Sequence, residues 1–154
     1  MREMSNDTQS WLAQGYEITT ERARVDVSAV HRYLSEQSYW AKNIPLEIVE
    51  RAIQHSLCFA VLHGDQLVGF ARVTSDRATV AYLGDVFILP AHRGKGLSKW
   101  LMESICAHPQ LQGLRRWMLA TADAHGLYAQ FGFTPIKAPA RWMEKHDPDV
   151  YARG

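Results

Sequence analysis

The segment from residue 82 to residue 106 joins an apolar run to an amphipathic stretch through a short basic connection that contains two glycines. The run YLGDVFIL is typical of a buried strand. After AHRGKG, apolar and small residues recur at the spacing of one helical face: Leu97, Trp100, Leu101, Ser104 and Ile105. The pattern predicts a strand, a glycine-rich turn and a helix that begins beside that turn.

The glycine-rich turn has the composition of an anion site. A helix start leaves free N–H groups and carries a partial positive charge, so it favours an anion. Gly94 and Gly96 let several amides turn toward one point and remove side chains that would keep a phosphate away. Arg93, Lys95 and Lys99 add positive charge. The features favour a diphosphate, and the alternative is a helix-entry loop whose cations face water.

Two familiar phosphate-binding loops do not match this turn. No segment fits the P-loop pattern G-x-x-x-x-G-K-S/T. The dinucleotide pattern G-x-G-x-x-G begins at Gly94 and Gly96 but meets Lys99 at its third glycine. That pattern also opens the first βαβ unit of a larger parallel sheet, whereas this turn lies past the middle of a short chain. Both nucleotide-binding classes are therefore excluded.

Hydrophobic periodicity and turn residues outline the other elements. Strands are expected at 15–20, 57–63, 66–73, 78–88, 114–121 and 132–136, with a turn at Gly64-Asp65 between the second and third, and an edge strand in 141–146 is an option. Helices are expected at 27–37 after the cap Asp26, in the segment that begins at Pro45, from residue 97, and at 124–131. The order β-α-α-β-β-β-α-β-α-β predicts an α/β (α+β) fold, a mixed sheet with helices packed on it. The 154 residues fit one domain, with its core at about 15–145.

Composition narrows the classes of partner. A net charge of +1 gives no reason to expect nucleic acid or an acidic membrane, so a positive site must come from local clustering. The N-terminal residues lack the apolar core of a signal peptide, and no stretch is long enough to span a bilayer, so a cytoplasmic location is expected by default. Cys58 and Cys106 lie far apart in apolar segments, which favours reduced thiols, and no zinc-ligand spacing suggests a metal.

The turn resembles the acetyl-CoA loop of the GNAT superfamily of N-acetyltransferases. The family pattern is Gln or Arg, two residues, Gly, one residue, and then Gly or Ala. Arg93 and Gly96 match it, whereas Ser98 stands where the family prefers glycine or alanine. A second family signature, a tyrosine four residues before Gly-Phe, is matched by Tyr128 in GLYAQFGF. The order of elements is also that of the family, which has a mostly antiparallel sheet flanked by helices.

The resemblance implies a reaction and its cofactor site. A primary amine would attack acetyl-CoA directly, and Tyr128 would protonate the leaving thiolate; the alternative is a core tyrosine on a short amphipathic helix. The cofactor would lie on the backbone of Val86, Phe87 and Ile88 and on the loop residues, which are Arg93, Gly94, Lys95, Gly96, Leu97 and Ser98. Acetyl-CoA is expected as a co-substrate, with no metal.

The reaction needs a neutral amine. For a lysine-like amine with a pKa of about 10.4, deprotonation at pH 7 costs about 4.6 kcal/mol, so a base or a chain of water molecules must assist. Asp85 is the first candidate because it is a lone carboxylate in an apolar strand. It could instead pair with Arg72 on the neighbouring strand. Asp123 and His125 are weaker candidates.

The acceptor is the least defined part. In the family, the connection between the first two helices often forms a wall of the acceptor pocket, and here it contains Tyr39 and Trp40. These aromatic residues could clamp a flat or cationic group, or could anchor the connection on the core. A small-molecule or peptide amine is expected, and a homodimer is an option that the family implies. A non-catalytic acyl-CoA-binding module is the main alternative; a nucleic-acid binder is disfavoured by the charge.

Overall fold

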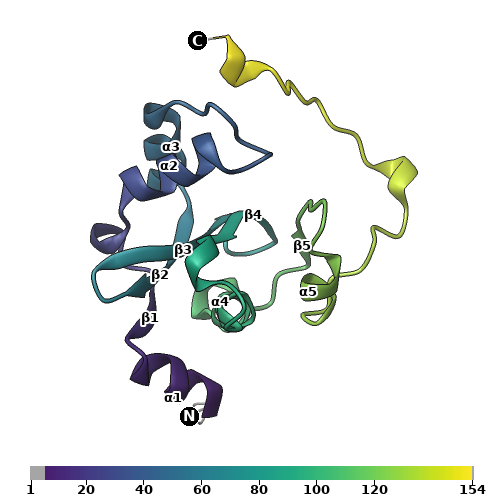
Figure 1. Cartoon of the computed structure of the whole chain (residues 1–154). Helices are drawn as coiled ribbons and strands as arrows, with labels where there is room; N and C mark the ends of the chain where they lie inside the picture. The colour runs from purple at the N-terminus through teal and green to yellow at the C-terminus, as the bar shows by residue number, and fades with distance from the viewer. Residues whose placement is uncertain (1–5, 154) are drawn as a thin grey trace.

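The structure is a computed structural model that describes residues 6–153, and its centre is a five-stranded sheet with the order β1-β2-β3-β4-β5 (Figure 1). The strands are β1 (Tyr16–Thr19), β2 (Leu57–His63), β3 (Gln66–Ser75), β4 (Val80–Ile88) and β5 (Arg116–Met118). The first four pair antiparallel, and β5 pairs parallel to β4. The mixed, mostly antiparallel sheet flanked by helices is therefore confirmed.

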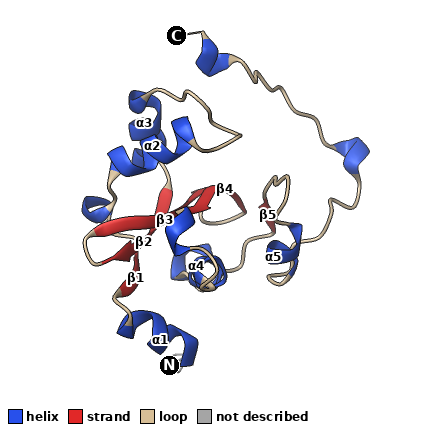
Figure 2. Ribbon diagram, in the orientation of Figure 1, coloured by secondary structure: helices blue, strands red, loops and turns tan. Residues whose placement is uncertain are grey.

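Helices cover both faces of this sheet (Figure 2). They are α1 (Asn6–Ala13), α2 (Val27–Glu36), α3 (Leu46–Gln54), α4 (Leu97–Cys106) and α5 (His125–Ala129). The alternation along β2 divides the core, because successive side chains of a strand point to opposite faces. Phe59 and Val61 pack with α4 and α1, whereas Ala60 and Leu62 pack with α2 and α3.

The predicted cap of α2 is confirmed, whereas Pro45 lies just before α3. Asp26 precedes α2, and its Oδ1 accepts a hydrogen bond from the N–H of Ala29 at 3.1 Å, which satisfies one of the free amides of the first turn. Pro45 is the residue before α3 rather than part of its first turn, with an extended backbone (φ −66°, ψ 148°). The α2–α3 connection lies between these two helices, and it carries the two aromatic residues singled out above.

A β-bulge interrupts the pairing of β3 with β4. Phe70 pairs with Phe87 and Arg72 with Gly84, so one residue of β3 faces two residues of β4. Asp85 lies in the bulge and has a left-handed backbone, with φ of 53°. Bulges bend a strand and redirect its side chains. The bulge therefore lies at the centre of the strand that was predicted to hold the cofactor, and nothing in the sequence had indicated it.

The C-terminal part departs from the prediction. Residues 132–136 and 141–146 form no strand, and β5 is limited to Arg116–Met118 within the predicted 114–121. From residue 134 to residue 153 the chain is a mostly exposed arm that leads away from α5 and returns toward α2 and α3 (Figure 1). A strand requires hydrogen bonds to a neighbouring strand, and none of the described strands extends beside these residues. Helix α1 was not predicted.

Candidate active site

The glycine-rich turn between β4 and α4 has the backbone that its sequence predicts. Gly94 and Gly96 both have φ of 78°, which is a left-handed conformation that glycine adopts without strain. Gly96 is the residue before α4. Within residues 6–153, no group accepts a hydrogen bond from the amides of Gly94, Lys95 or Gly96. These N–H groups at a helix start can therefore bind an anion.

The two glycines serve different purposes. A Cβ on Gly94 would meet no atom within 4 Å, so a side chain there would project into open space. A Cβ on Gly96 would lie 3.1 Å from Cζ2 of Trp11, so Gly96 allows close contact with α1. Arg93 also differs from its expected role as a free cation: its Nε donates to the carbonyl of Ile88 at 2.9 Å and its Nη2 donates to the Tyr33 hydroxyl at 3.0 Å. The guanidinium thus joins the turn to β4 and α2.

A small cavity of about 250 Å³ adjoins the turn. Its lining includes most of the predicted loop residues: Arg93, Gly94, Gly96, Leu97 and Ser98. Lys95 does not line it, because its carbonyl faces α1 and its side chain is exposed. Ile88, Arg93, Ser98 and Leu127 also line a larger cavity of about 1000 Å³, so the two cavities are neighbours.

The larger cavity runs along the free edge of β4. The parallel pairing with β5 covers only Val80, Ala81 and Tyr82, so the strands part beyond Tyr82. Val86, Phe87 and Ile88 line the cavity at this open edge. The Phe87 ring itself packs in the core, stacked on Tyr33 with 4.0 Å between ring centroids. Phe87 therefore offers its backbone rather than its side chain.

Tyr128 reaches the same cavity from α5. Its side chain is buried, and no group within residues 6–153 forms a hydrogen bond with its hydroxyl. Burial raises the pKa of Tyr128 above the ordinary value, and Tyr39 and Asp123 raise it further. The phenol is therefore protonated at neutral pH and is able to donate a proton.

Asp85 occupies the middle of a short polar network. Its Oδ2 accepts from Nε of Arg72 at 2.8 Å, and its Oδ1 accepts from the indole N–H of Trp40 at 2.9 Å. Arg72 also donates to the hydroxyls of Ser56 (3.1 Å) and Thr74 (3.3 Å). The pairing of Asp85 with Arg72, the alternative raised by the sequence, is therefore formed, and it adds a contact with Trp40 that no sequence pattern indicated.

The aromatic pair of the α2–α3 connection lines the cavity rather than the core. Tyr39 is 62% exposed and Trp40 40% exposed, and their rings meet edge to face at 5.0 Å. The Tyr39 hydroxyl accepts a hydrogen bond from the N–H of Ala122 at 3.0 Å, which links the connection to the loop before α5. The structure thus brings Tyr39, Trp40, Asp85 and Tyr128 to one cavity.

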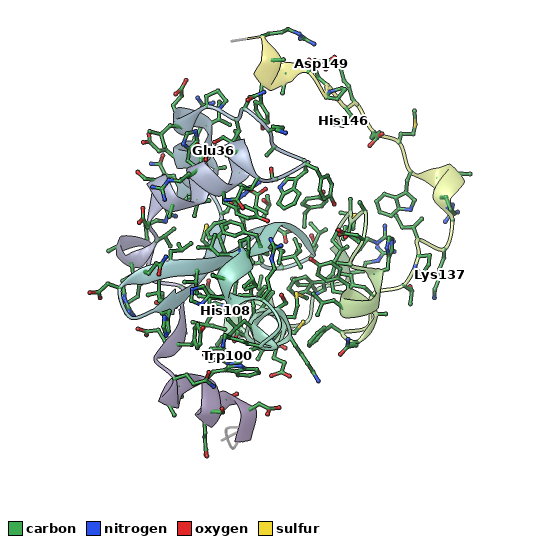
Figure 3. The ribbon with its side chains drawn as sticks, viewed as in Figure 1. Glu36, Trp100, His108, Lys137, His146 and Asp149 are labelled. Carbon is green, nitrogen blue, oxygen red and sulfur yellow. The ribbon has the colours of Figure 1, made fainter. Side chains whose placement is uncertain are left out.

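The C-terminal arm adds residues that the sequence interpretation missed. Glu144, Lys145 and His146 line the same cavity, and Tyr151 packs against the α2–α3 side of the core. Figure 3 shows His146 on this arm. Among residues 6–153, no group of three or more His, Cys, Asp or Glu side chains is placed to hold a metal ion. In the same range, no helix has both the length and the apolar character needed to cross a membrane.

Comparison with known proteins decides the family. Residues 27–133 match the model of the acetyltransferase (GNAT) family. The chain belongs to the GNAT family. A protein of Gibberella zeae assigned as an acetyltransferase is 31% identical over 144 residues, with 79% of this chain and 80% of the relative covered. This GNAT protein is accordingly an acyltransferase.

Solved structures agree with this assignment. A Xanthomonas campestris protein assigned to the GNAT family as an acetyltransferase is 55% identical, with a TM-score of 0.87 over 89% of this GNAT protein and 96% of that chain. A Mycobacterium tuberculosis protein crystallised with CoA shares the fold at 21% identity, with a TM-score of 0.60 over 79% of this chain and 73% of that one. The matched residues 27–133 contain the turn and Tyr128, whereas α1, β1 and the arm lie outside them.

Proposed function

We propose that this protein transfers the acetyl group of acetyl-CoA to a primary amine of a small molecule or peptide. The observation that supports this proposal most strongly is the arrangement of groups around the open edge of β4. A protonated, buried Tyr128 and the carboxylate Asp85 line one cavity, and the free amides of the glycine-rich turn lie at its end. This arrangement combines an anion site, a strand edge and an acid with a candidate base.

The residues present fit acetyl-CoA in two ways. The amides of Gly94, Lys95 and Gly96 suit a diphosphate, because they have no acceptor within residues 6–153 and Gly94 leaves the space beside it open. Val86, Phe87 and Ile88 present backbone at a strand edge that β5 does not cover. The amide groups of pantetheine could pair with such an edge as an added strand does.

When bound, acetyl-CoA supplies a thioester whose carbonyl carbon the acceptor amine attacks. Tyr128 holds a proton at neutral pH because its pKa is raised. The leaving thiolate can take that proton. A backbone N–H at the edge of β4 can polarise the thioester carbonyl.

Asp85 is retained as the proposed base, with ordered water as the alternative route for the proton. Each carboxylate oxygen has two lone pairs, and each oxygen of Asp85 accepts one hydrogen bond from a described side chain. One lone pair per oxygen therefore remains for the amine or for a water molecule. The contact with Trp40 places the aromatic pair beside this carboxylate, where a cationic amine would be stabilised on both sides.

Calorimetric titration with acetyl-CoA, followed in the same sample by thiol release against a panel of primary amines, tests this function. Binding with amine-dependent release supports the transferase and begins to define the acceptor. Binding without release for every amine in a broad panel supports the acyl-CoA-binding alternative. Absence of binding would contradict the assignment of the glycine-rich turn.

Three further expectations stay predictions. A homodimer is tested by light scattering on the purified protein, where a mass near twice 17.5 kDa is expected. The cytoplasmic location is tested by cell fractionation. The expected lack of nucleic-acid binding is tested by titration with duplex DNA and RNA at low salt, where any association would be weak and salt-sensitive.

A further inference from the structure

Trp11 connects α1 directly to the proposed diphosphate site. Its side chain is 8% exposed, and its ring stacks on Trp100 of α4 with 5.0 Å between centroids and 17° between planes (Figure 3 shows Trp100 beside α1). Its indole N–H donates to the carbonyl of Lys95 at 2.8 Å, across 84 residues of chain. Stacking alone would bury the ring, so the hydrogen bond adds a constraint on the turn itself.

The hydrogen bond sets the direction of one amide of the turn. No peptide bond within residues 6–153 is cis, and in a planar trans peptide the C=O and the following N–H point in opposite directions. The carbonyl of Lys95 points at Trp11. The N–H of Gly96 therefore points away from Trp11. Gly96 is among the residues that line the cavity at the turn, whereas Trp11 is not.

A second contact supports the turn from the same side. Because a Cβ on Gly96 would lie 3.1 Å from Cζ2 of Trp11, the indole edge packs against the backbone of Gly96. Close by, the Tyr16 hydroxyl of β1 and Nδ1 of His92 are hydrogen-bonded at 2.7 Å, which holds the residue before Arg93. The N-terminal segment thus contacts the turn at both ends, and it lies outside the residues that match the family model.

We propose that Trp11 is a positioning residue for the diphosphate site. Its N–H holds the Lys95–Gly96 peptide in the orientation in which the Gly96 amide faces the bound diphosphate. The turn is then ordered before the cofactor binds, and less conformational entropy is lost on binding. The inference rests on the proposed function, because it needs the turn to receive CoA.

The test replaces Trp11 by phenylalanine, which keeps an aromatic ring but removes the N–H donor. Loss of this one hydrogen bond to the turn should raise the dissociation constant for CoA about tenfold. The second readout is kcat/KM with acetyl-CoA compared with S-acetyl-pantetheine, which lacks the diphosphate. Trp11→Phe should lower the first value about tenfold and leave the second unchanged. The ratio of the two is independent of any fraction of misfolded protein, since both substrates are measured on one sample.

Two control variants separate positioning from packing. Trp100→Phe replaces the other tryptophan of the stacked pair by phenylalanine but keeps the hydrogen bond from Trp11 to Lys95. It should lower thermal stability without changing the ratio of kcat/KM with acetyl-CoA to kcat/KM with S-acetyl-pantetheine. Leu12→Ala alters an exposed residue of α1 and should change neither value. If Trp11→Phe lowers kcat/KM equally with acetyl-CoA and with S-acetyl-pantetheine, or leaves the affinity for CoA unchanged, the positioning role is overturned and the proposed function is not. Failure of the wild-type protein to bind CoA would overturn the proposed function and this inference together.

Discussion

At the scale of single residues, the left-handed conformation of Asp85 organises the part of the cavity that we propose receives the acceptor. The bulge turns its carboxylate so that it accepts from Arg72 on β3 and from Trp40 on the α2–α3 connection. A non-glycine residue with positive φ is uncommon, and such residues concentrate at functional sites. One carboxylate therefore joins three segments of chain and remains open to the cavity.

Asp85→Asn is expected to lower kcat/KM for the amine at least about tenfold, because asparagine cannot accept a proton from the amine. Asparagine adopts left-handed backbone readily, so the bulge should persist. The measurement is steady-state kinetics of variant and wild type with the amine concentration varied. A raised acceptor KM with an unchanged kcat would show that Asp85 positions Trp40 instead. Trp40→Phe, which removes the N–H donor and replaces the indole by a smaller ring, provides the comparison.

Tyr128→Phe is expected to lower kcat about a hundredfold, because general acid catalysis contributes on that order. The dissociation constant for CoA should stay within about twofold of the wild-type value, which is well below the effect of losing one hydrogen bond. Steady-state thiol release and calorimetry measure the two quantities. An acetyl thioester of an acidic aromatic thiol tests the role directly, because its leaving thiolate needs no proton. The defect should shrink with that donor, and a defect of equal size would argue against an acid.

Gly96→Ala is expected to weaken CoA binding about tenfold, since a left-handed backbone costs an L-residue about 1–2 kcal/mol and the new Cβ would crowd Trp11. Gly113→Ala is the matched control. Gly113 has φ of 73° and open space around it, and it lines neither cavity described above. It should therefore lose thermal stability but keep its CoA affinity. Equal affinities for both variants and wild type would contradict the role of the turn.

At the scale of elements, the site depends on where neighbouring strands stop pairing. Strands β4 and β5 are hydrogen-bonded only at the start of β4, and the bulge follows directly. The remaining edge of β4 is thereby available at the start of α4, where the glycine-rich turn lies. On the other side of that turn, α1 and β1 support it through Trp11 and Tyr16. The connection between β4 and α4 is thus held by α1 and β1, while the edge of β4 beside it stays free of β5.

The contact between β1 and the turn predicts a pH dependence of stability. Burial lowers the pKa of His92 below its ordinary value, and His63 and Lys95 lower it further. Among residues 6–153, Tyr16 is the remaining titratable group in contact with the ring. A depressed pKa in the folded state means that the neutral form is favoured there. The stabilisation is present above the unfolded pKa of about 6.5 and is lost as pH falls through the folded pKa.

Thermal unfolding at pH 7.5 and pH 5.5 measures this effect. Wild type should lose melting temperature on acidification, and His92→Asn, which keeps an acceptor near the position of Nδ1, should lose less. A fall in melting temperature of equal size in His92→Asn would show that another titratable group causes the pH dependence. His108 is one such group, because burial lowers its pKa as well.

At the scale of the whole molecule, a family domain is extended at both ends by segments with different tasks. The N-terminal segment contacts the glycine-rich turn, whereas the C-terminal arm lines the large cavity on the side proposed for the acceptor. The arm contacts the body through Trp142, whose ring lies 4.7 Å from the Arg116 guanidinium, and through Tyr151. Much of its apolar surface is exposed, with Met143 at 96%.

Truncation after Ile136 is expected to raise the acceptor KM several-fold and to leave the CoA dissociation constant nearly unchanged, because Glu144, Lys145 and His146 line the large cavity but not the one at the turn. Steady-state kinetics with the best amine of the panel and calorimetry with CoA measure both. Arg153→Ala, which removes an exposed ion pair within the arm, is the control and should have little effect. Loss of CoA binding on truncation would contradict the division of tasks.

Local patterns in the sequence predicted much of the fold and of the candidate site. Asp26 as a cap, the hairpin at Gly64, the left-handed glycines of the turn and the short helix of Tyr128 all depend on residues within a few positions of one another. The strand expected at 132–136 was wrong and the optional edge strand in 141–146 does not form, because strand formation depends on a partner that local sequence does not specify. Helix α1 was missed for a related reason: its stability depends on packing of Trp11 against α4.

The sequence by itself determined the family and the left-handed glycines of the turn, and it supplied the candidate residues for acetyl transfer, since each depends on a short run of neighbours. Only the tertiary structure decided how these residues work together. The bulge at Asp85, its bonds to Arg72 and Trp40, the bond from Trp11 to Lys95 and the path of the arm all join residues far apart in the chain. Such contacts depend on how whole elements pack, and packing is a property of the folded chain rather than of any segment in it.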